Sequence, residues 1–150
     1  MKHSWIVIKP EAGRLMLSII KCIRSNVDGV SLETHSGVEL SGPDISVLCD
    51  VPSKPIQAYV ADHLCCKPLT VIRIQSEDSS LEDRIAVLRG RHFDPNACEP
   101  TTLRRVLSEE TTVSPVNVID GQQYFPNFVE TPQSSEQIVL YDRILQKHFS

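Results

Sequence analysis

Long apolar runs are missing from this sequence. A membrane-spanning helix needs about 20 consecutive apolar residues, whereas the apolar run Trp5–Ile8 stops at Lys9. The same run is too short to be the apolar region of a secretory signal peptide. We therefore expect a cytoplasmic protein without a membrane partner.

An excess of positive charge is also missing. Lys and Arg together number 15 against 19 Asp and Glu, which gives a formal net charge of -4. Nucleic acids and anionic membranes are bound mainly through basic surfaces, so this balance argues against both as partners. A local group of basic side chains remains compatible with a small phosphate-containing ligand.

The cysteines lack the spacing of a disulfide framework or of a metal site. Their number is odd, and the adjacent Cys65 and Cys66 do not form a Cys-x-x-Cys motif. Reduced thiols in an intracellular protein, buried or half-buried, are therefore expected. The cysteines are Cys22, Cys49, Cys65, Cys66 and Cys98.

Internal repeats and low-complexity segments are absent as well. With 150 residues, of which 41% are hydrophobic, the chain is expected to form one domain over 1–150. Four apolar segments with flanking Pro or Gly predict β-strands. These segments are Ser4–Lys9, Val30–Leu40 with an interruption at Ser36-Gly37, Leu69–Gln75 and Val116–Asp120.

Apolar residues that recur three and four positions apart predict helices between these strands. The predicted helices are Glu11–Ser25, Asp44–Asp50, Pro55–Cys66, Ser79 or Ser80 to Leu88, a turn over Thr101–Leu107, and Gln133–Phe149. Expected N-caps are Ser41 or Asp44 for the second helix, and Ser134 or Ser135 for the last. Two long irregular stretches, 89–115 and 121–132, flank the last strand. This order predicts an α+β, ferredoxin-like βαββαβ sandwich, with a four-stranded antiparallel sheet and helices on one face.

Several motifs occur in a fixed order along these elements. They are Trp5–Ala12 with its Lys-Pro-Glu end, Lys54-Pro55, Pro68 before Leu69–Ile72, Leu88–Gly90, Asp94–Ala97, Glu99–Arg104, and Val116–Gly121. Together they resemble the nucleoside diphosphate kinase family. That family has a strand ending in Lys-Pro-Asp, a Leu-x-Gly-x-Thr-Asn-Pro segment running into Pro-Gly-Thr-Ile-Arg, and a later Asn-x-x-His-Gly segment. The resemblance covers nearly the whole chain and implies the family's fold.

The resemblance also implies a set of phosphate-binding residues. Lys9 matches the lysine that contacts the γ-phosphate, and Arg104 matches an arginine that pairs with phosphate oxygens. Asn117 matches the asparagine that contacts the sugar, and Lys54 stands where the family has an arginine. A further arginine on the preceding helix is matched by Arg84, Arg89 or Arg91.

The departures from the family pattern concern the reacting group and the base pocket. Asp120 takes the place of the nucleophilic histidine; it is shorter, and its negative charge faces a polyphosphate. Gln137 replaces the glutamate that orients this histidine. Leu48 and Ile56 replace the aromatic residues that line the nucleotide pocket. His92 lies on the loop that approaches the phosphates and is an alternative nucleophile, although we expect a loop histidine without a catalytic part.

Three functions follow from this comparison. The first is an inactive kinase-like module that is a structural or interaction component of a protein assembly. Degenerate family members occur in ciliary axonemes and radial spokes, so the cilium is the suggested location by analogy. The second is a nucleotide sensor that binds Mg²⁺ and a nucleoside tri- or diphosphate through Lys9, Lys54, Arg104 and Asn117. The third is a working kinase that uses Asp120 or His92; no cofactor is expected for the first function.

The resemblance further predicts a common site and leaves the oligomeric state open. Lys9, Arg104, Asn117 and Asp120 are expected to converge in one cavity, with Lys9 paired to Asp120. Family enzymes are usually hexamers or tetramers, so a homo-oligomer is one expectation. The loop 89–115, which helps to form trimer contacts in the family, here differs in sequence and carries the acidic Glu109 and Glu110.

Overall fold

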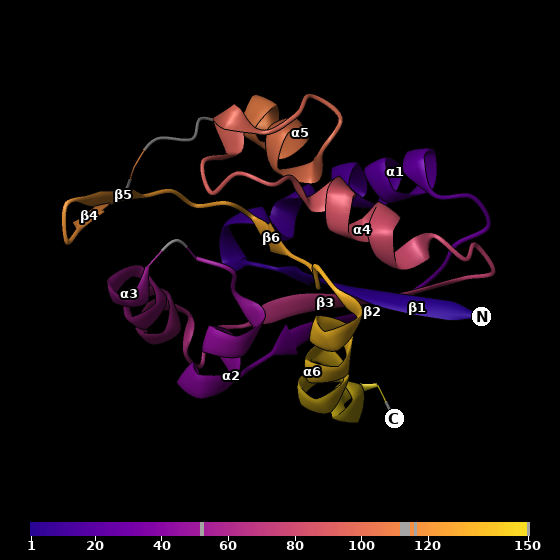
Figure 1. Cartoon of the computed structure of the whole chain (residues 1–150), viewed down its shortest axis with the longest axis horizontal. Helices are drawn as coiled ribbons and strands as arrows, with labels where there is room; N and C mark the ends of the chain where they lie inside the picture. Colours follow the sequence, from indigo (N-terminus) through magenta and orange to yellow (C-terminus); the bar gives the residue numbers. More distant parts are fainter. Residues whose placement is uncertain (52, 112–114, 116, 150) are drawn as a thin grey trace.

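A four-stranded antiparallel sheet lies at the centre of the molecule (Figure 1). The computed structural model describes residues 1–51, 53–111, 115 and 117–149. The strand order is β2-β3-β1-β6. The strands are β1 (Lys2–Ile8), β2 (Ser31–Val38), β3 (Leu69–Ser76) and β6 (Val129–Glu130). The predicted α+β class and four-stranded antiparallel sheet are therefore confirmed.

The central strand β1 supplies apolar side chains to both faces of the sheet, because successive residues of a strand point in opposite directions. Trp5 and Val7 belong to one buried cluster, and Ile6 and Ile8 to the other. Helices α2, α3 and α6 cover the first face, and α1, α4 and α5 cover the second (Figure 1). The expectation of helices on one face is therefore wrong, because helices cover both faces of the sheet.

The helices lie close to their predicted positions, except that 3-10 turns occupy the start of the first predicted helix and the end of the last. They are α1 (Met16–Asn26), α2 (Gly42–Leu48), α3 (Lys54–Leu64), α4 (Leu81–Arg89), α5 (Leu103–Glu110) and α6 (Ser135–Leu145), with short 3-10 turns η1 (Pro10–Leu15), η2 (Pro95–Ala97) and η3 (Gln146–His148). Of the two pairs of alternatives, Ser41 and Ser134 are the N-caps, since the hydroxyl of each accepts a hydrogen bond from the backbone N–H three residues later.

The strand β2 has one irregularity. Its register shifts between His35 and Val38, where Gly37 has a φ of 72°. Among the described residues, no helix is long and apolar enough to cross a membrane.

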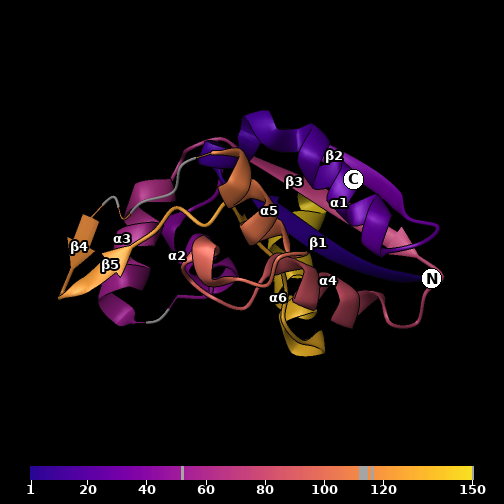
Figure 2. The same ribbon diagram turned by 90° about the horizontal axis from the view of Figure 1, so that it is seen from above.

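The fourth predicted strand does not join the central sheet. Val116 lies outside the described residues, and Asn117–Ile119 (β4) pairs with Gln122–Tyr124 (β5) in a separate hairpin. At its tip, Asp120 and Gly121 have φ values of 50° and 77°. Asp-Gly with positive φ at both residues is the preferred two-residue hairpin turn. Local turn chemistry therefore folds this segment back on its own neighbour, and the hairpin lies at one end of the molecule beside α3 (Figure 2).

The true fourth strand, β6, is only two residues long. Val129 and Glu130 pair with Ile8 and Val7 of β1, and both are buried. Two residues are too few to show an alternating pattern, which explains why this strand has no signal of its own in the sequence. Its position brings the segment 127–131 next to the end of β1.

A buried hydrogen bond joins α6 to the last residue of α2. The Tyr141 hydroxyl donates to the Leu48 carbonyl oxygen at 2.6 Å, and both residues are buried. Tyr141→Phe leaves this carbonyl without its partner, so we expect the free energy of unfolding to fall by about 1–3 kcal/mol. Val139→Ala, on the same helix but 57% exposed, is the matched control and is expected to change it by less than about 0.5 kcal/mol. Equal effects in urea denaturation would contradict the importance of this bond.

Candidate functional site

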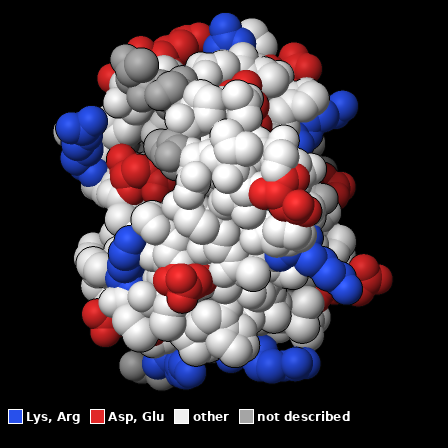
Figure 3. Space-filling model, turned by 90° about the vertical axis from the view of Figure 1, so that its left-hand side faces the viewer, with Lys and Arg blue, Asp and Glu red and all other residues white. Residues whose placement is uncertain are grey.

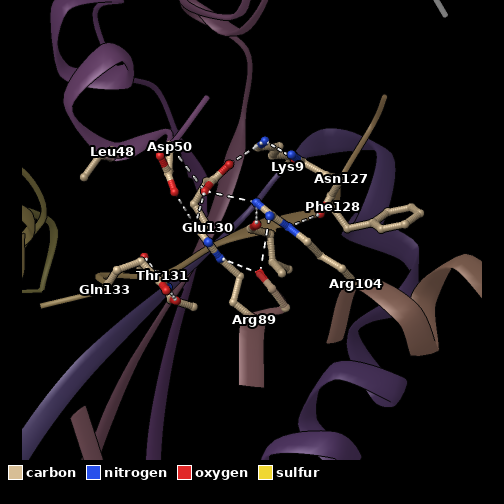
Figure 4. A network of polar contacts seen from close by, with 12 residues as sticks. Lys9, Leu48, Asp50, Arg89, Arg104, Asn127, Phe128, Glu130, Thr131 and Gln133 are labelled. Carbon is tan, nitrogen blue, oxygen red and sulfur yellow. Dashed lines mark hydrogen bonds and ion pairs between the residues drawn. The ribbon is translucent and has the colours of Figure 1, made fainter. Parts of the chain in front are cut away.

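The Glu130 carboxylate is the centre of a buried group of charged side chains (Figure 4). Its exposed fraction is 0%, and the three cations around it, Lys9, Arg89 and Arg104, are at most 3% exposed. These residues come from three separate parts of the chain: the end of β1, the end of α4 and the start of α5. The fold therefore assembles the group through long-range packing.

Lys9 reaches Glu130 because it follows β1 directly and Pro10 turns the chain away. Its Nζ donates to Glu130 Oε2 at 2.8 Å and also to Asn127 Oδ1. The backbone N–H of Lys9 donates to the Phe128 carbonyl oxygen at 2.8 Å, which extends the pairing of β1 with β6. Burial lowers the pKa of Lys9, but the Glu130 carboxylate, together with smaller effects of Cys49, Tyr124 and Glu11, raises this pKa above its ordinary value.

Arg104 uses its whole guanidinium group to hold the segment that carries Glu130. Its Nη2 lies 3.2 Å from Glu130 Oε1 and donates to the Val129 carbonyl oxygen at 3.1 Å. Its Nε donates to the Asn127 carbonyl oxygen at 3.2 Å, and its Nη1 to that of His92 at 3.0 Å. Burial lowers the pKa of Arg104, and Glu130 acts in the opposite direction. A planar fork of donors is what this geometry requires.

Arg89 completes the group from the last turn of α4. Its Nη1 lies 3.4 Å from Glu130 Oε1 and 3.5 Å from Asp50 Oδ2, and its Nε donates to the Gly90 carbonyl oxygen at 2.9 Å. Gly90 has a φ of 103°, and a Cβ at this position would lie 2.9 Å from Cys98 Sγ. Glycine is therefore required where α4 ends beside the site.

The three cations keep Glu130 ionised. Burial alone raises the pKa of a carboxyl group, but Lys9, Arg104 and Arg89 together hold the pKa of Glu130 below its ordinary value. Two neighbouring weak acids respond differently: burial raises the pKa of Cys49 and of Tyr124 to about 12, so both stay protonated at neutral pH. The site therefore holds one buried carboxylate anion, that of Glu130, among three cations, with the exposed Asp50 at its edge.

A small cavity opens next to this group. It has a volume of about 170 Å³ and is lined by Asp50, Val51, Arg89, Arg91, Phe93 and Arg104. Its charged lining therefore consists of three arginines and one aspartate. The end of the molecule shown in Figure 3 carries basic and acidic side chains intermixed, without a continuous basic groove.

An aromatic cluster fills the space between α3 and the loop that contains Phe93. Tyr124 of β5 is 3% exposed, and its ring centroid lies 5.2 Å from that of Tyr59 and 5.9 Å from that of Phe93. Tyr59 in turn stacks on His63 at 5.6 Å. The Lys9 ammonium partly offsets the effect of burial on the Tyr124 pKa. The β4–β5 hairpin therefore inserts a tyrosine close to the Lys9 side of the site.

The structure brings together only part of the predicted site. Lys9 and Arg104 meet as expected, but Asn117 and Asp120 are exposed on the β4–β5 hairpin, and Lys9 pairs with Glu130. The predicted convergence of all four residues is therefore wrong. Its physical reason is the Asp-Gly turn, which directs this segment into a separate hairpin.

The remaining predicted residues divide between the site and other places. Of the three arginine alternatives, Arg89 contacts Glu130, Arg91 lines the cavity, and Arg84 is an exposed residue that pairs with Asp78 at 2.9 Å. Lys54 is exposed at the first turn of α3, and the His92 side chain is exposed. Leu48 and Ile56 are buried in the core and do not line a pocket in place of aromatic residues. Gln137 accepts a hydrogen bond from the Gln133 backbone N–H at 2.7 Å and so caps α6.

Asn127 and Glu130 are the site residues that the sequence interpretation missed. The segment Asn127-Phe128-Val129-Glu130 has the same Asn-x-x-X spacing as the segment around Asn117, and it leads directly into the last helix. That closeness to the α6 N-cap, Ser134, is the signal that would have identified it. Among the described residues, no group of three or more His, Cys, Asp or Glu side chains is placed to hold a metal ion.

Comparison with known proteins supports the fold. No family model and no curated protein matches the chain. Solved structures do: an apo nucleoside diphosphate kinase from Encephalitozoon cuniculi is 18% identical, with a TM-score of 0.64 over 95% of this chain and 87% of that chain. The fold is that of the nucleoside diphosphate kinases. An enzyme from Pyrobaculum aerophilum is 15% identical, with a TM-score of 0.61 over 95% and 93% of the two chains. One from Borrelia burgdorferi, with bound vanadate and ADP, is 14% identical, with a TM-score of 0.63 over 93% and 83%.

Within this nucleoside diphosphate kinase-like fold, Glu130→Gln tests the importance of the central carboxylate. It leaves three buried cations without their shared anion, so we expect the free energy of unfolding at pH 7 to fall by about 3–5 kcal/mol. Glu109→Gln is the control, because Glu109 forms an exposed pair with Arg105 on α5; it is expected to cost less than about 0.5 kcal/mol. Denaturant titrations of both variants measure the difference.

The pH dependence of the same variant follows from the lowered pKa of Glu130. A carboxyl whose folded pKa is lowered stabilises the protein fully above its unfolded pKa, about 4.3 for Glu, and loses this effect as pH falls through the folded pKa. The difference in unfolding free energy between wild type and Glu130→Gln should therefore be constant from about pH 6 to 7 and narrow below about pH 4. A difference that stays constant down to acid unfolding would show that the Glu130 charge is not responsible.

Proposed function

We propose that this chain is a catalytically inactive, nucleoside diphosphate kinase-like module that acts as a structural or protein-interaction component. The observation that carries the proposal is the Glu130 carboxylate, which is buried and held by Lys9, Arg89 and Arg104. We assign Glu130, instead of Asp120, to the position of the family's nucleophilic histidine. The basis is its spacing from Asn127 and its place beside β1, just before α6.

A carboxylate in this setting is a poor nucleophile toward a nucleoside triphosphate. Attack on the γ-phosphorus would form an acyl phosphate and expel the nucleoside diphosphate. To do so, Glu130 would give up the contacts of its attacking oxygen, which are those of Oε1 with the two arginines or that of Oε2 with Lys9. Its negative charge would also face the incoming phosphate. Cations that would stabilise a transferring phosphoryl group are already paired with an internal anion.

The surroundings of the site support the same proposal. Tyr124 packs against Tyr59 and Phe93 between α3 and the loop after α4. Leu48 and Ile56 belong to the core and offer no stacking surface to a base. An assembly such as the ciliary axoneme or the radial spoke remains our suggestion for the partners and the location, by analogy alone.

A second candidate function, nucleotide sensing, is favoured by one observation. The cavity of about 170 Å³ beside Glu130 is lined by Arg89, Arg91 and Arg104, a set of donors suited to an oxyanion of phosphate size. Binding there would use these arginines and, with Mg²⁺, a nucleoside di- or triphosphate, without any transfer. The working kinase has less support, because Asp120 is exposed on the β4–β5 hairpin and the His92 side chain is exposed, with only the His92 carbonyl oxygen in contact with Arg104.

An activity assay tests the inactive-module proposal. The purified protein is expected to transfer no phosphate from γ-labelled ATP to GDP, and to retain no label after denaturation. Glu130→His is expected to recover little, because the arginines lose their anion and the buried Leu48 and Ile56 still offer no stacking surface to a base. The exposed-site variants Asp120→Asn and His92→Ala control for contaminating host kinase, since a contaminant responds to neither. Turnover by the wild type that disappears in Asp120→Asn, His92→Ala or Glu130→Gln would overturn the proposal.

Thermal melting separates the inactive module from the sensor. A ligand that binds only the folded state at 100 times its Kd adds about 2.7 kcal/mol of stability. For the inactive module we expect no change in Tm with ATP or GDP, each with and without Mg²⁺. A rise in Tm that is lost in Arg91→Ala would instead support the sensor, because Arg91 lines the cavity but is exposed. A rise that survives this substitution would place the ligand elsewhere.

A further inference from the structure

A tight turn at the end of α3 places two adjacent cysteines at the surface. Cys65 has φ -54° and ψ 127°, and Cys66 has φ 62°. The Lys67 backbone N–H donates to the Leu64 carbonyl oxygen at 3.1 Å, which closes the turn. These values describe a type II β-turn, whose third position favours Gly or Asn because its φ is positive. Cysteine therefore occupies a position where its Cβ is unfavourable.

The turn brings the two sulfur atoms together. Cys65 Sγ and Cys66 Sγ lie 3.4 Å apart, and one thiol donates a hydrogen bond to the other. Cys66 is exposed and Cys65 half-buried, whereas the other three cysteines of the chain are buried. The hydrogen bond to Cys65 raises the pKa of the Cys66 thiol, so Cys66 is mainly in the thiol form at neutral pH. Closeness and access, more than ionisation, distinguish this pair.

We propose that Cys65 and Cys66 form a reversible oxidation site that exchanges with low-molecular-weight disulfides to give a vicinal disulfide. In the first step, the thiolate of one cysteine attacks a sulfur of the small disulfide. A mixed disulfide forms, and one small thiolate leaves and takes up a proton. In the second step, the neighbouring sulfur, after losing its proton, attacks the protein sulfur of the mixed disulfide. The Cys65–Cys66 bond forms, a second small thiol leaves, and the two electrons lost by the cysteines reduce the small disulfide.

Ring strain makes this oxidation reversible. Adjacent residues joined by a trans peptide have Cα atoms about 3.8 Å apart, which is less than the range of about 4.4–6.8 Å found for ordinary disulfides. A disulfide closed across this distance is strained, and strained, exposed disulfides are the readily reduced ones. The site is therefore suited to respond to the redox state of its surroundings and unsuited to be a permanent cross-link. The two cysteines follow α3 and lie outside the Glu130 group. The proposed oxidation therefore does not depend on the proposed function.

Glutathione buffers with a graded ratio of reduced to oxidised form test this proposal on the full chain. Samples are quenched in acid, alkylated after denaturation, and analysed by intact mass and peptide mapping. As oxidised glutathione increases, we expect two of the five cysteines to become protected together, both in the peptide that holds Cys65 and Cys66, without a glutathione adduct. Dithiothreitol should reverse the change. No oxidation at any ratio, a disulfide to a different cysteine, or a cross-linked dimer would overturn the proposal.

Single substitutions sharpen the test. In Cys65→Ser or Cys66→Ser the second step cannot occur, so the remaining thiol should accumulate the glutathione adduct that the wild type does not retain. Cys22→Ser is the matched control and should oxidise like the wild type, because Cys22 lies in α1. Unchanged melting of the reduced variants shows that the fold is intact. Equal accumulation of the adduct in wild type and Cys65→Ser would mean that the two sulfurs do not react with each other.

Discussion

The ion pairs of the buried Glu130 carboxylate connect several separate parts of this chain. A single apolar contact at the same place could not fix the positions of so many segments. One carboxylate connects the end of β1 through Lys9, the end of α4 through Arg89 and the start of α5 through Arg104. The Asp50 backbone N–H, in the segment between α2 and α3, also lies 3.5 Å from Glu130 Oε1. The positions of these elements are therefore fixed by one group that must stay charged and fully partnered.

Burying such a group has a large desolvation cost, which can cancel the attraction between its charges. Removing four charged side chains from water costs several kcal/mol for each ion, and their mutual attraction offsets this only when the geometry is good and other polar atoms are bonded. Arg104 meets this requirement, because its guanidinium group donates hydrogen bonds to backbone carbonyl oxygens and also pairs with Glu130. An apolar core of the same volume can be equally stable. Stability alone therefore does not explain why this arrangement is present.

The sequence allowed a correct prediction of those parts of the fold that have a local pattern. The strands β1 and β3 have apolar runs, β2 has a weaker alternation, the helices have apolar stripes, and Ser41 and Ser134 have the side chains of N-caps. It failed at the last strand, because β6 contains two residues and owes its place to pairing with β1.

Prediction of the site residues has the same limit, because it succeeds only where a residue belongs to an element with a local pattern. Lys9 and Arg104 stand at the ends of elements with clear patterns, so their motifs could be recognised. The segment Asn117-Val118-Ile119-Asp120 matches the Asn-x-x-His-Gly motif in its asparagine and the following glycine, yet its Asp-Gly end forms a hairpin turn. Glu130 could not be predicted to be buried from its type alone, because a fully buried glutamate needs partners that only the tertiary structure supplies.

Arg104 has one more effect, which concerns the edge of the sheet. The Phe128 carbonyl oxygen faces β1, where it accepts the Lys9 backbone N–H, and the Val129 carbonyl oxygen faces the other way and accepts from Arg104. The outer side of β6 is therefore occupied by a guanidinium group and extends over only two residues. Short edges and edges occupied by charged side chains resist the addition of a foreign strand. Among the described strands of the central sheet, β2 alone leaves a long edge open, so growth of this sheet by strand addition has one available direction.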